Sequence, residues 1–166
     1  DMAKYAPKLK PAIEQARVKV LNTGGAADQI ITLCGTMEFE DRGVANVAGV
    51  DLQRRFVAGK IPAEFRERAA KALSQRLKKA TPEFARYALA RIGDRSAEPG
   101  LRLALLRVMA RQGAHFPELF DQLEKAAAEM PQRFGFDNLA AYGVHGVLSR
   151  PEWKGRPAPA WAKKAA

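Results

Sequence analysis

The sequence has very little of the chemistry on which most metal sites and nucleophilic enzymes depend. Only one cysteine and two histidines occur among the 166 residues. A single cysteine excludes a disulfide within the chain, and the apolar run Ile30–Cys34 predicts a buried, unreactive thiol. Neither His115 nor His145 has a second ligand at helical spacing. We therefore expect no metal and no cofactor.

Long apolar runs are lacking too. No stretch approaches the roughly 18 apolar residues that a membrane-spanning helix needs, and the N-terminus has no apolar signal-peptide core. We therefore expect a soluble cytoplasmic protein without membrane insertion. Because the chain begins with Asp1 rather than Met, an export signal that has already been removed stays an open alternative.

Motifs for reading a base sequence are also missing. The chain has no glycine-aromatic RNA-binding signature, no two-cysteine, two-histidine finger and no helix-turn-helix glycine pattern. Gly24-Gly25 is not followed by the Lys-Ser/Thr of a phosphate-binding loop and is expected to separate two helices. Nothing in the sequence therefore predicts sequence-specific recognition of a nucleic acid.

The sequence does contain residues that typically form helices and residues that typically begin them. Alanine, leucine and arginine are abundant, and β-branched residues are sparse after residue 60. Five prolines stand just ahead of segments with helical apolar spacing: Pro11, Pro62, Pro82, Pro99 and Pro117. The sequence predicts an all-α fold, either a small helical bundle or an irregular solenoid-like array of about seven short helices.

The expected helices can be placed on the sequence from this spacing. They cover residues 11–21, 26–37, 51–58, 62–79, 82–92, 99–112, 117–130 and 137–148, with mostly loop at 38–50. In the helix 62–79, Arg68, Lys71, Lys78 and Lys79 are expected on the face opposite the apolar residues. Residues 1–150 are predicted to form one helical domain, and the Pro-, Trp- and Lys-containing segment 151–166 an extended or flexible tail.

Positive charge is concentrated in one region of the chain. The formal net charge is +10, and residues 51–111 alone contain fifteen basic and six acidic residues, a net charge of +9. Residues 1–50 contain six of each sign. Localised positive charge on a helical domain is typical of a protein with a polyanionic partner, most often a nucleic acid.

We therefore predict a non-enzymatic protein that binds the phosphate backbone of a nucleic acid without sequence specificity, as a small subunit of a ribonucleoprotein or DNA-processing complex. Tyr87 and Trp153 are the aromatic residues expected to be exposed enough for base stacking. The predicted backbone contacts are the basic residues Arg54, Arg55, Lys60, Arg68, Lys71, Lys78, Lys79, Arg86, Arg91, Arg95, Arg102, Arg107 and Arg111.

Two other functions remain open at this level. The chain could be a helical adaptor whose basic surface meets an acidic protein, with the tail 151–166 or the helix 117–130 as a second protein contact. It could also be an enzyme that cleaves an anionic glycan, with Glu38 and Glu40 as the paired carboxylates, although a surface acidic patch explains these residues more simply.

Overall fold

The described part of the chain is entirely helical. The computed structural model describes residues 2–112 together with residues 115 and 122. Residues 2–112 form six helices and no strand: α1 (Met2–Thr23), α2 (Ala26–Phe39), α3 (Arg42–Val57), α4 (Ala63–Arg76), α5 (Pro82–Gly93) and α6 (Pro99–Gln112). The predicted all-α class is confirmed. Most of the predicted helix 117–130, the helix 137–148 and the tail 151–166 lie outside the described residues.

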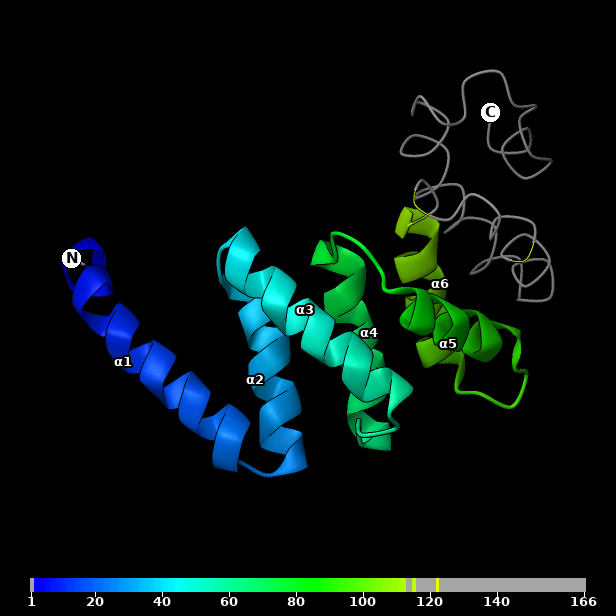
Figure 1. The fold of residues 1–166 in the computed structure, drawn as a ribbon, viewed down its shortest axis with the longest axis horizontal. Coiled ribbons are helices and arrows are strands. Elements are labelled where there is room, and N and C mark those ends of the chain that lie inside the picture. Colours follow the sequence, from blue (N-terminus) through cyan, green and yellow to red (C-terminus); the bar gives the residue numbers. More distant parts are fainter. Residues whose placement is uncertain (1, 113–114, 116–121, 123–166) are drawn as a thin grey trace, which may run out of the picture.

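The helices are arranged in two rows (Figure 1). α2, α4 and α6 pack on one another in sequence to form one row, and α3 packs on α5 in the other. Contacts of α2 with α3, α3 with α4 and α5 with α6 join the rows, while α1 packs on α2 at one end. This arrangement fits the predicted bundle or solenoid-like array.

The core lies between the rows and is built from apolar side chains of the helices. Ile30 and Leu33 of α2 are fully or almost fully buried, as are Phe84 of α5 and Leu105 of α6. Phe56 and Phe84 contact each other with ring centroids 5.7 Å apart. Burying such side chains contributes about 1.5–3 kcal/mol each, which makes this cluster the main source of stability.

The first helix is longer than predicted. α1 begins at Met2 instead of Pro11, and it contains both Pro7 and Pro11. Each proline removes one backbone hydrogen bond, which is costly inside a buried helix. Pro11 leaves the carbonyl group of Pro7 without a donor, and because residue 7 is exposed, water can hydrate that carbonyl.

Predicting a loop at 38–50 was wrong. α3 begins at Arg42, because Oδ1 of Asp41 accepts hydrogen bonds from the backbone N–H groups of Gly43 (2.9 Å) and Val44 (3.0 Å) and caps the helix. The small residues of this segment serve packing rather than flexibility. A Cβ atom at Gly49 would lie 3.2 Å from Cε of Met37, so glycine lets α3 approach α2 closely.

The helix predicted at 62–79 ends early, at Arg76. Residues 77–81 form an extended linker whose backbone is held by two buried glutamines from other helices. Oε1 of Gln53 accepts from the N–H of Thr81 at 2.7 Å, and Oε1 of Gln112 accepts from the N–H of Ala80 at 2.8 Å. Lys78 and Lys79 therefore lie on this linker and not, as predicted, on a helical face.

The helices after the linker agree with the prediction. Thr81 caps α5 by accepting a hydrogen bond from the N–H of Phe84 at 3.2 Å, and Pro82 occupies the first turn. α6 spans the predicted residues 99–112. Gly24 and Gly25 separate α1 from α2, as expected for a break between helices.

Candidate nucleic-acid interface

Three of the predicted backbone contacts are instead engaged in holding the fold together. Nη1 of Arg55 donates to Oε1 of Gln29 at 2.6 Å, and its Nε lies 3.3 Å from an oxygen of Asp51. Nε and Nη2 of Arg102 both donate to the carbonyl oxygen of Ile92, at 2.9 and 2.8 Å. That carbonyl lies in the last turn of α5, so Arg102 compensates the partial negative charge at a helix end.

Arg111 acts in the same way on α4. Its Nη1 donates to the carbonyl oxygens of Ser74 and Gln75, the latter at 2.9 Å, in the last turn of that helix. A guanidinium group is suited to this task because it presents several donors in a fixed plane. These cations are exposed to different degrees, but their first role is structural.

Other predicted contacts have acidic or aromatic partners nearby. Lys71 pairs with Glu67 at 2.5 Å, and Arg86 lies 3.9 Å from Glu83. Arg91 lies 3.4 Å from an oxygen of Asp94, and its guanidinium is 5.7 Å from the centroid of the Tyr87 ring. Arg95 and Arg107 have interaction partners as well. Exposed pairs of this kind are weak, so they lower the effective charge of the region without removing it.

Between residues 42 and 79, six cations are exposed and form no ion pair or side-chain hydrogen bond with any described residue. We call them the free cations: Arg42, Arg54, Lys60, Arg68, Lys78 and Lys79. Five of the six belong to the predicted set, and Arg42 does not. Arg42 lies in the segment that was predicted to be a loop and in the charge-balanced first fifty residues, so nothing in the sequence led us to expect it at the interface.

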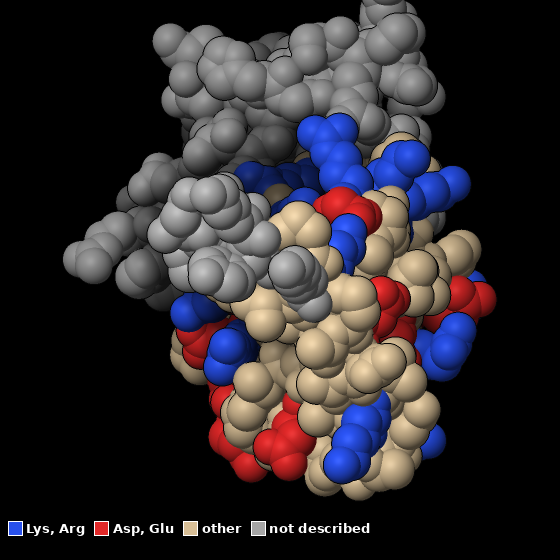
Figure 2. Space-filling model, turned by 90° about the vertical axis from the view of Figure 1, so that its left-hand side faces the viewer, with Lys and Arg blue, Asp and Glu red and all other residues tan. Residues whose placement is uncertain are grey.

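The charge balance of the first fifty residues is visible on the surface. Figure 2 shows the α1 end of the molecule, where Lys and Arg side chains are interspersed with Asp and Glu and form no large field of one sign. The free cations belong to α3, to α4 and to the two segments that follow these helices. The candidate interface is therefore on the middle of the array and not at its α1 end.

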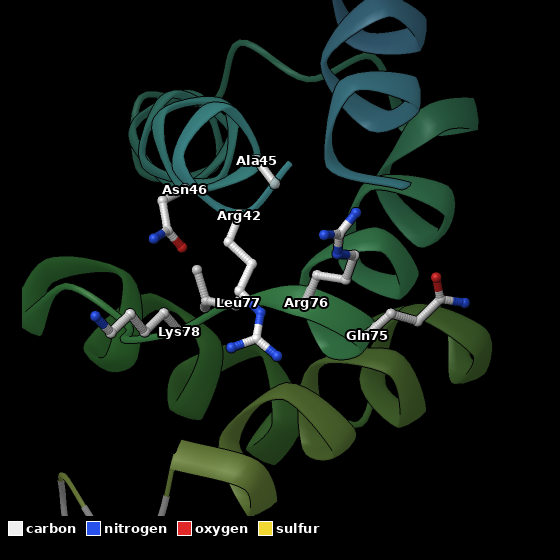
Figure 3. Close-up of a pocket in the computed structure, with 7 residues that line it drawn as sticks. All are labelled: Arg42, Ala45, Asn46, Gln75, Arg76, Leu77 and Lys78. Atoms are coloured by element: carbon white, nitrogen blue, oxygen red, sulfur yellow. The ribbon is translucent and has the colours of Figure 1, made fainter. Parts of the chain in front are cut away.

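A hollow of about 410 Å³ lies where α3 begins and α4 ends (Figure 3). Three cations line it: Arg42 from the first turn of α3, Arg76 from the last turn of α4 and Lys78 from the linker. The remaining lining residues are the amides Asn46 and Gln75 and the apolar Ala45 and Leu77. Among the described residues, no carboxylate lines this hollow.

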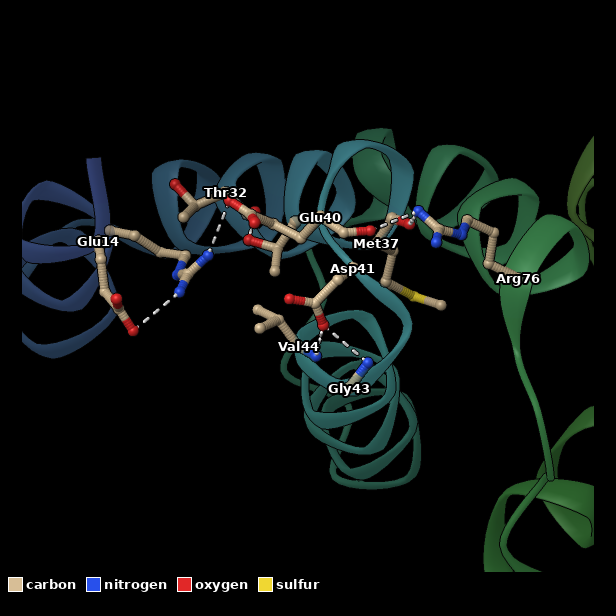
Figure 4. A network of polar contacts seen from close by, with 10 residues as sticks. Glu14, Thr32, Met37, Glu40, Asp41, Gly43, Val44 and Arg76 are labelled. Carbon is tan, nitrogen blue, oxygen red and sulfur yellow. Dashed lines mark hydrogen bonds and ion pairs between the residues drawn. The ribbon is translucent and has the colours of Figure 1, made fainter. Parts of the chain in front are cut away.

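Arg76 was not among the predicted contacts either, and its role is structural. Its Nη1 donates to the carbonyl oxygens of Met37 (2.9 Å), Glu38 (3.1 Å) and Glu40 (2.9 Å) at the end of α2 (Figure 4). Arg76, Arg102 and Arg111 thus each cover the carbonyl end of a neighbouring helix. A pattern of this kind depends on which helix ends meet, and no local sequence signal reveals it.

The acidic cluster at 38–41 is engaged in the fold as well. Asp41 caps α3, and Glu40 pairs with Arg17 of α1 at 3.1 Å (Figure 4). The hydrogen bond from the backbone N–H of Val44 is the main cause that lowers the pKa of Asp41. This geometry gives the glycan-cleaving alternative no support.

Four aromatic residues of α3, α4 and α5 are directed inward. Tyr87, expected to be exposed, is half-buried and packs against Phe56 (5.7 Å) and Phe84 (6.2 Å between ring centroids), with Arg91 over its ring. Phe65 is half-buried against the core. Trp153 lies outside the described residues. Phe56, Phe65, Phe84 and Tyr87 are thus not placed for base stacking, whereas Phe39 at the end of α2 is 86 % exposed.

The remaining candidates for chemistry are accounted for in the same way. Cys34 is fully buried, as predicted, and burial raises its thiol pKa to about 11. His115 lies in a turn, where its backbone N–H donates to the carbonyl oxygen of Gln112 at 2.8 Å. In residues 2–112, 115 and 122 no group of three acidic, histidine or cysteine side chains could hold a metal ion. None of the described helices could cross a membrane.

Comparison with known proteins assigns no family. No protein-family model matches the chain, and neither the curated proteins nor the solved structures contain a significant match. The function therefore has to be argued from the charges and contacts described above.

Proposed function

We propose that this chain is a non-enzymatic protein that binds the phosphate backbone of a nucleic acid without reading its sequence. The observation that carries the proposal is the set of six free cations, Arg42, Arg54, Lys60, Arg68, Lys78 and Lys79. Unpaired, solvated cations can exchange their counterions for phosphates without breaking an existing ion pair. Such a protein would act as a subunit of a ribonucleoprotein or DNA-processing complex.

Two features favour backbone contacts over base contacts. Tyr87, Phe84 and Phe56 pack on one another, so these rings are not available to stack on bases. The free cations are long, flexible side chains on four different segments, which suits a repeating phosphate chain better than a fixed pattern of base edges. We therefore expect duplex DNA to bind at least as tightly as a single strand of the same length.

The six free cations set the number of phosphate contacts that we expect. Each neutralised phosphate on duplex DNA contributes about −0.9 to the slope of log K against log salt concentration. Thirteen predicted contacts would give about −12, whereas the six free cations alone would give about −5. The expected slope therefore lies between about −2 and about −5.

The test is a titration of the purified chain, freed of co-purified nucleic acid, into labelled duplex DNA and single-stranded RNA and DNA at several salt concentrations. The triple variant Arg54→Gln, Lys60→Gln, Arg68→Gln should bind more weakly and flatten the slope by up to about 3, because three counterion exchanges are lost. Circular dichroism of the variant checks that it is folded. Unchanged affinity in a folded triple variant would count against the proposal.

A further inference from the structure

The hollow between α3 and α4 has the composition of an anion site. Its three cations, Arg42, Arg76 and Lys78, are accompanied by two amides and, within the described part of the chain, by no carboxylate. Arg42 and Lys78 are exposed and have no partner among the described residues. We propose that this hollow seats one phosphate group of the bound backbone, with Arg42 and Lys78 as its direct contacts. The inference rests on the proposed function and names the site at which the backbone is anchored.

The position of Arg42 supports a role outside the folding of α3. Arg42 is the first residue of that helix, where the helix dipole disfavours a cation by about 0.3–1 kcal/mol. Figure 3 shows its side chain extending from α3 toward the linker that carries Leu77 and Lys78, so the guanidinium stands over the hollow. A guanidinium can bind two oxygens of one phosphate at once.

The carbonyl groups that would repel an anion here are already covered. The last turn of α4 presents the carbonyl oxygens of Ser74 and Gln75 to Arg111, and that of Leu77 accepts from Nε2 of Gln112 at 3.3 Å. Arg76 covers the carbonyl end of α2, and Figure 3 shows its guanidinium turned away from that of Arg42. Arg76 therefore contributes charge and one wall, and the contacts fall to Arg42 and Lys78.

The nearest acidic side chains are also turned to other partners. Asp41 directs Oδ1 at the N–H groups of Gly43 and Val44, and Glu40 pairs with Arg17 on the side of α1 (Figure 4). The walls are held in place, since Gln112 and Gln53 fix the backbone of the linker. Phosphate would thus enter a preformed cationic hollow with little reorganisation beyond two side chains.

The test compares two double variants of equal charge. Arg42→Gln with Lys78→Gln removes the two hollow contacts, and Arg54→Gln with Lys60→Gln removes two free cations that do not line the hollow. Both should flatten the salt slope by about 2, because each loses two charges. We expect the hollow variant to weaken duplex binding at low salt about tenfold more than its control, since bidentate contacts in a preformed site are lost as well. Equal weakening by the two folded variants overturns the inference.

A second measurement separates this inference from the proposed function. If the unmodified chain binds no nucleic acid at low salt, the proposed function fails, and the hollow is judged with inorganic phosphate alone. Chemical-shift changes of the Arg42 and Lys78 amides on adding phosphate, absent in the double variant, would keep the hollow as a phosphate site. Absence of those changes in the unmodified chain overturns it.

Discussion

Replacing Arg76 by glutamine should destabilise the protein, although Arg76 lies in the basic region like the free cations. One guanidinium nitrogen contacts the carbonyl oxygens of Met37, Glu38 and Glu40 at 2.9–3.1 Å. A single nitrogen shared by three acceptors does not make three full hydrogen bonds. A hydrogen bond to a charged group contributes about 1.5–3 kcal/mol, and a cation at a helix carbonyl end up to about 1 kcal/mol more. We therefore expect Arg76→Gln to lower the free energy of unfolding by about 2–3 kcal/mol.

The assay is urea unfolding followed by circular dichroism near pH 7, with Arg42→Gln as the matched control. Arg42 carries the same charge but is exposed at the unfavourable end of α3, so its replacement should change the free energy of unfolding by less than about 0.5 kcal/mol. An equal m-value in both variants would show that the same surface is exposed on unfolding. If Arg76→Gln destabilises the protein no more than Arg42→Gln does, the distinction between structural cations and free cations is refuted.

Three other properties can be tested more briefly. Gln112→Leu leaves the buried N–H of Ala80 without its acceptor and should cost about 1–3 kcal/mol in the same urea assay, whereas a loss below about 0.5 kcal/mol would show that Gln112 does not hold the linker. Burial raises the pKa of Cys34 to about 11, so a thiol reagent at about pH 8 should react only after urea is added, and fast reaction of the native protein would contradict this burial. The lowered pKa of Asp41 gives stability that is present above its unfolded pKa of about 3.9 and is lost as pH falls through the folded pKa. Asp41→Asn keeps the cap and should reduce the fall in Tm between about pH 5 and pH 3; an unchanged fall would show that Asp41 does not contribute to it.

Local patterns in the sequence predicted those parts of the fold that local interactions determine. α6 spans the predicted residues, and α5 is capped by Thr81 and Pro82 as expected. The apolar run Ile30–Cys34 also predicted the burial of Cys34 correctly. In each case the cap and the apolar face lie within one helix, so a single segment contains the information.

The sequence failed where distant residues decide the structure. Lys78 and Lys79 have good helix propensity, yet they lie outside α4. Gln53 and Gln112, 28 and 32 residues from their linker partners, hold the backbone of residues 81 and 80. The glycine-rich start of α3 was predicted to be a loop. Instead, Gly49 lies in the helix, where the Met37 side chain packs so close that a Cβ atom would be crowded. Tertiary contacts of this kind are not visible from local propensity.

The same reason limited the prediction of the interface. Charge counting treats all cations of residues 51–111 alike, whereas Arg102 and Arg111 cover helix ends and Lys71 has a carboxylate partner. The hollow joins Arg42 to Lys78, which are 36 positions apart in the sequence and come together only because α3 begins where α4 ends. Sequence reasoning identified a basic region but could not identify which of its charges remain available.

The most direct test of the central claim is the salt dependence of duplex DNA binding by the unmodified chain. The account predicts binding at low salt that weakens linearly on a log–log plot with a slope between about −2 and −5, as expected for contacts drawn from six free cations. A slope near −12 would show that cations beyond the six free ones also bind phosphates, and no binding at low salt would contradict the proposed function itself.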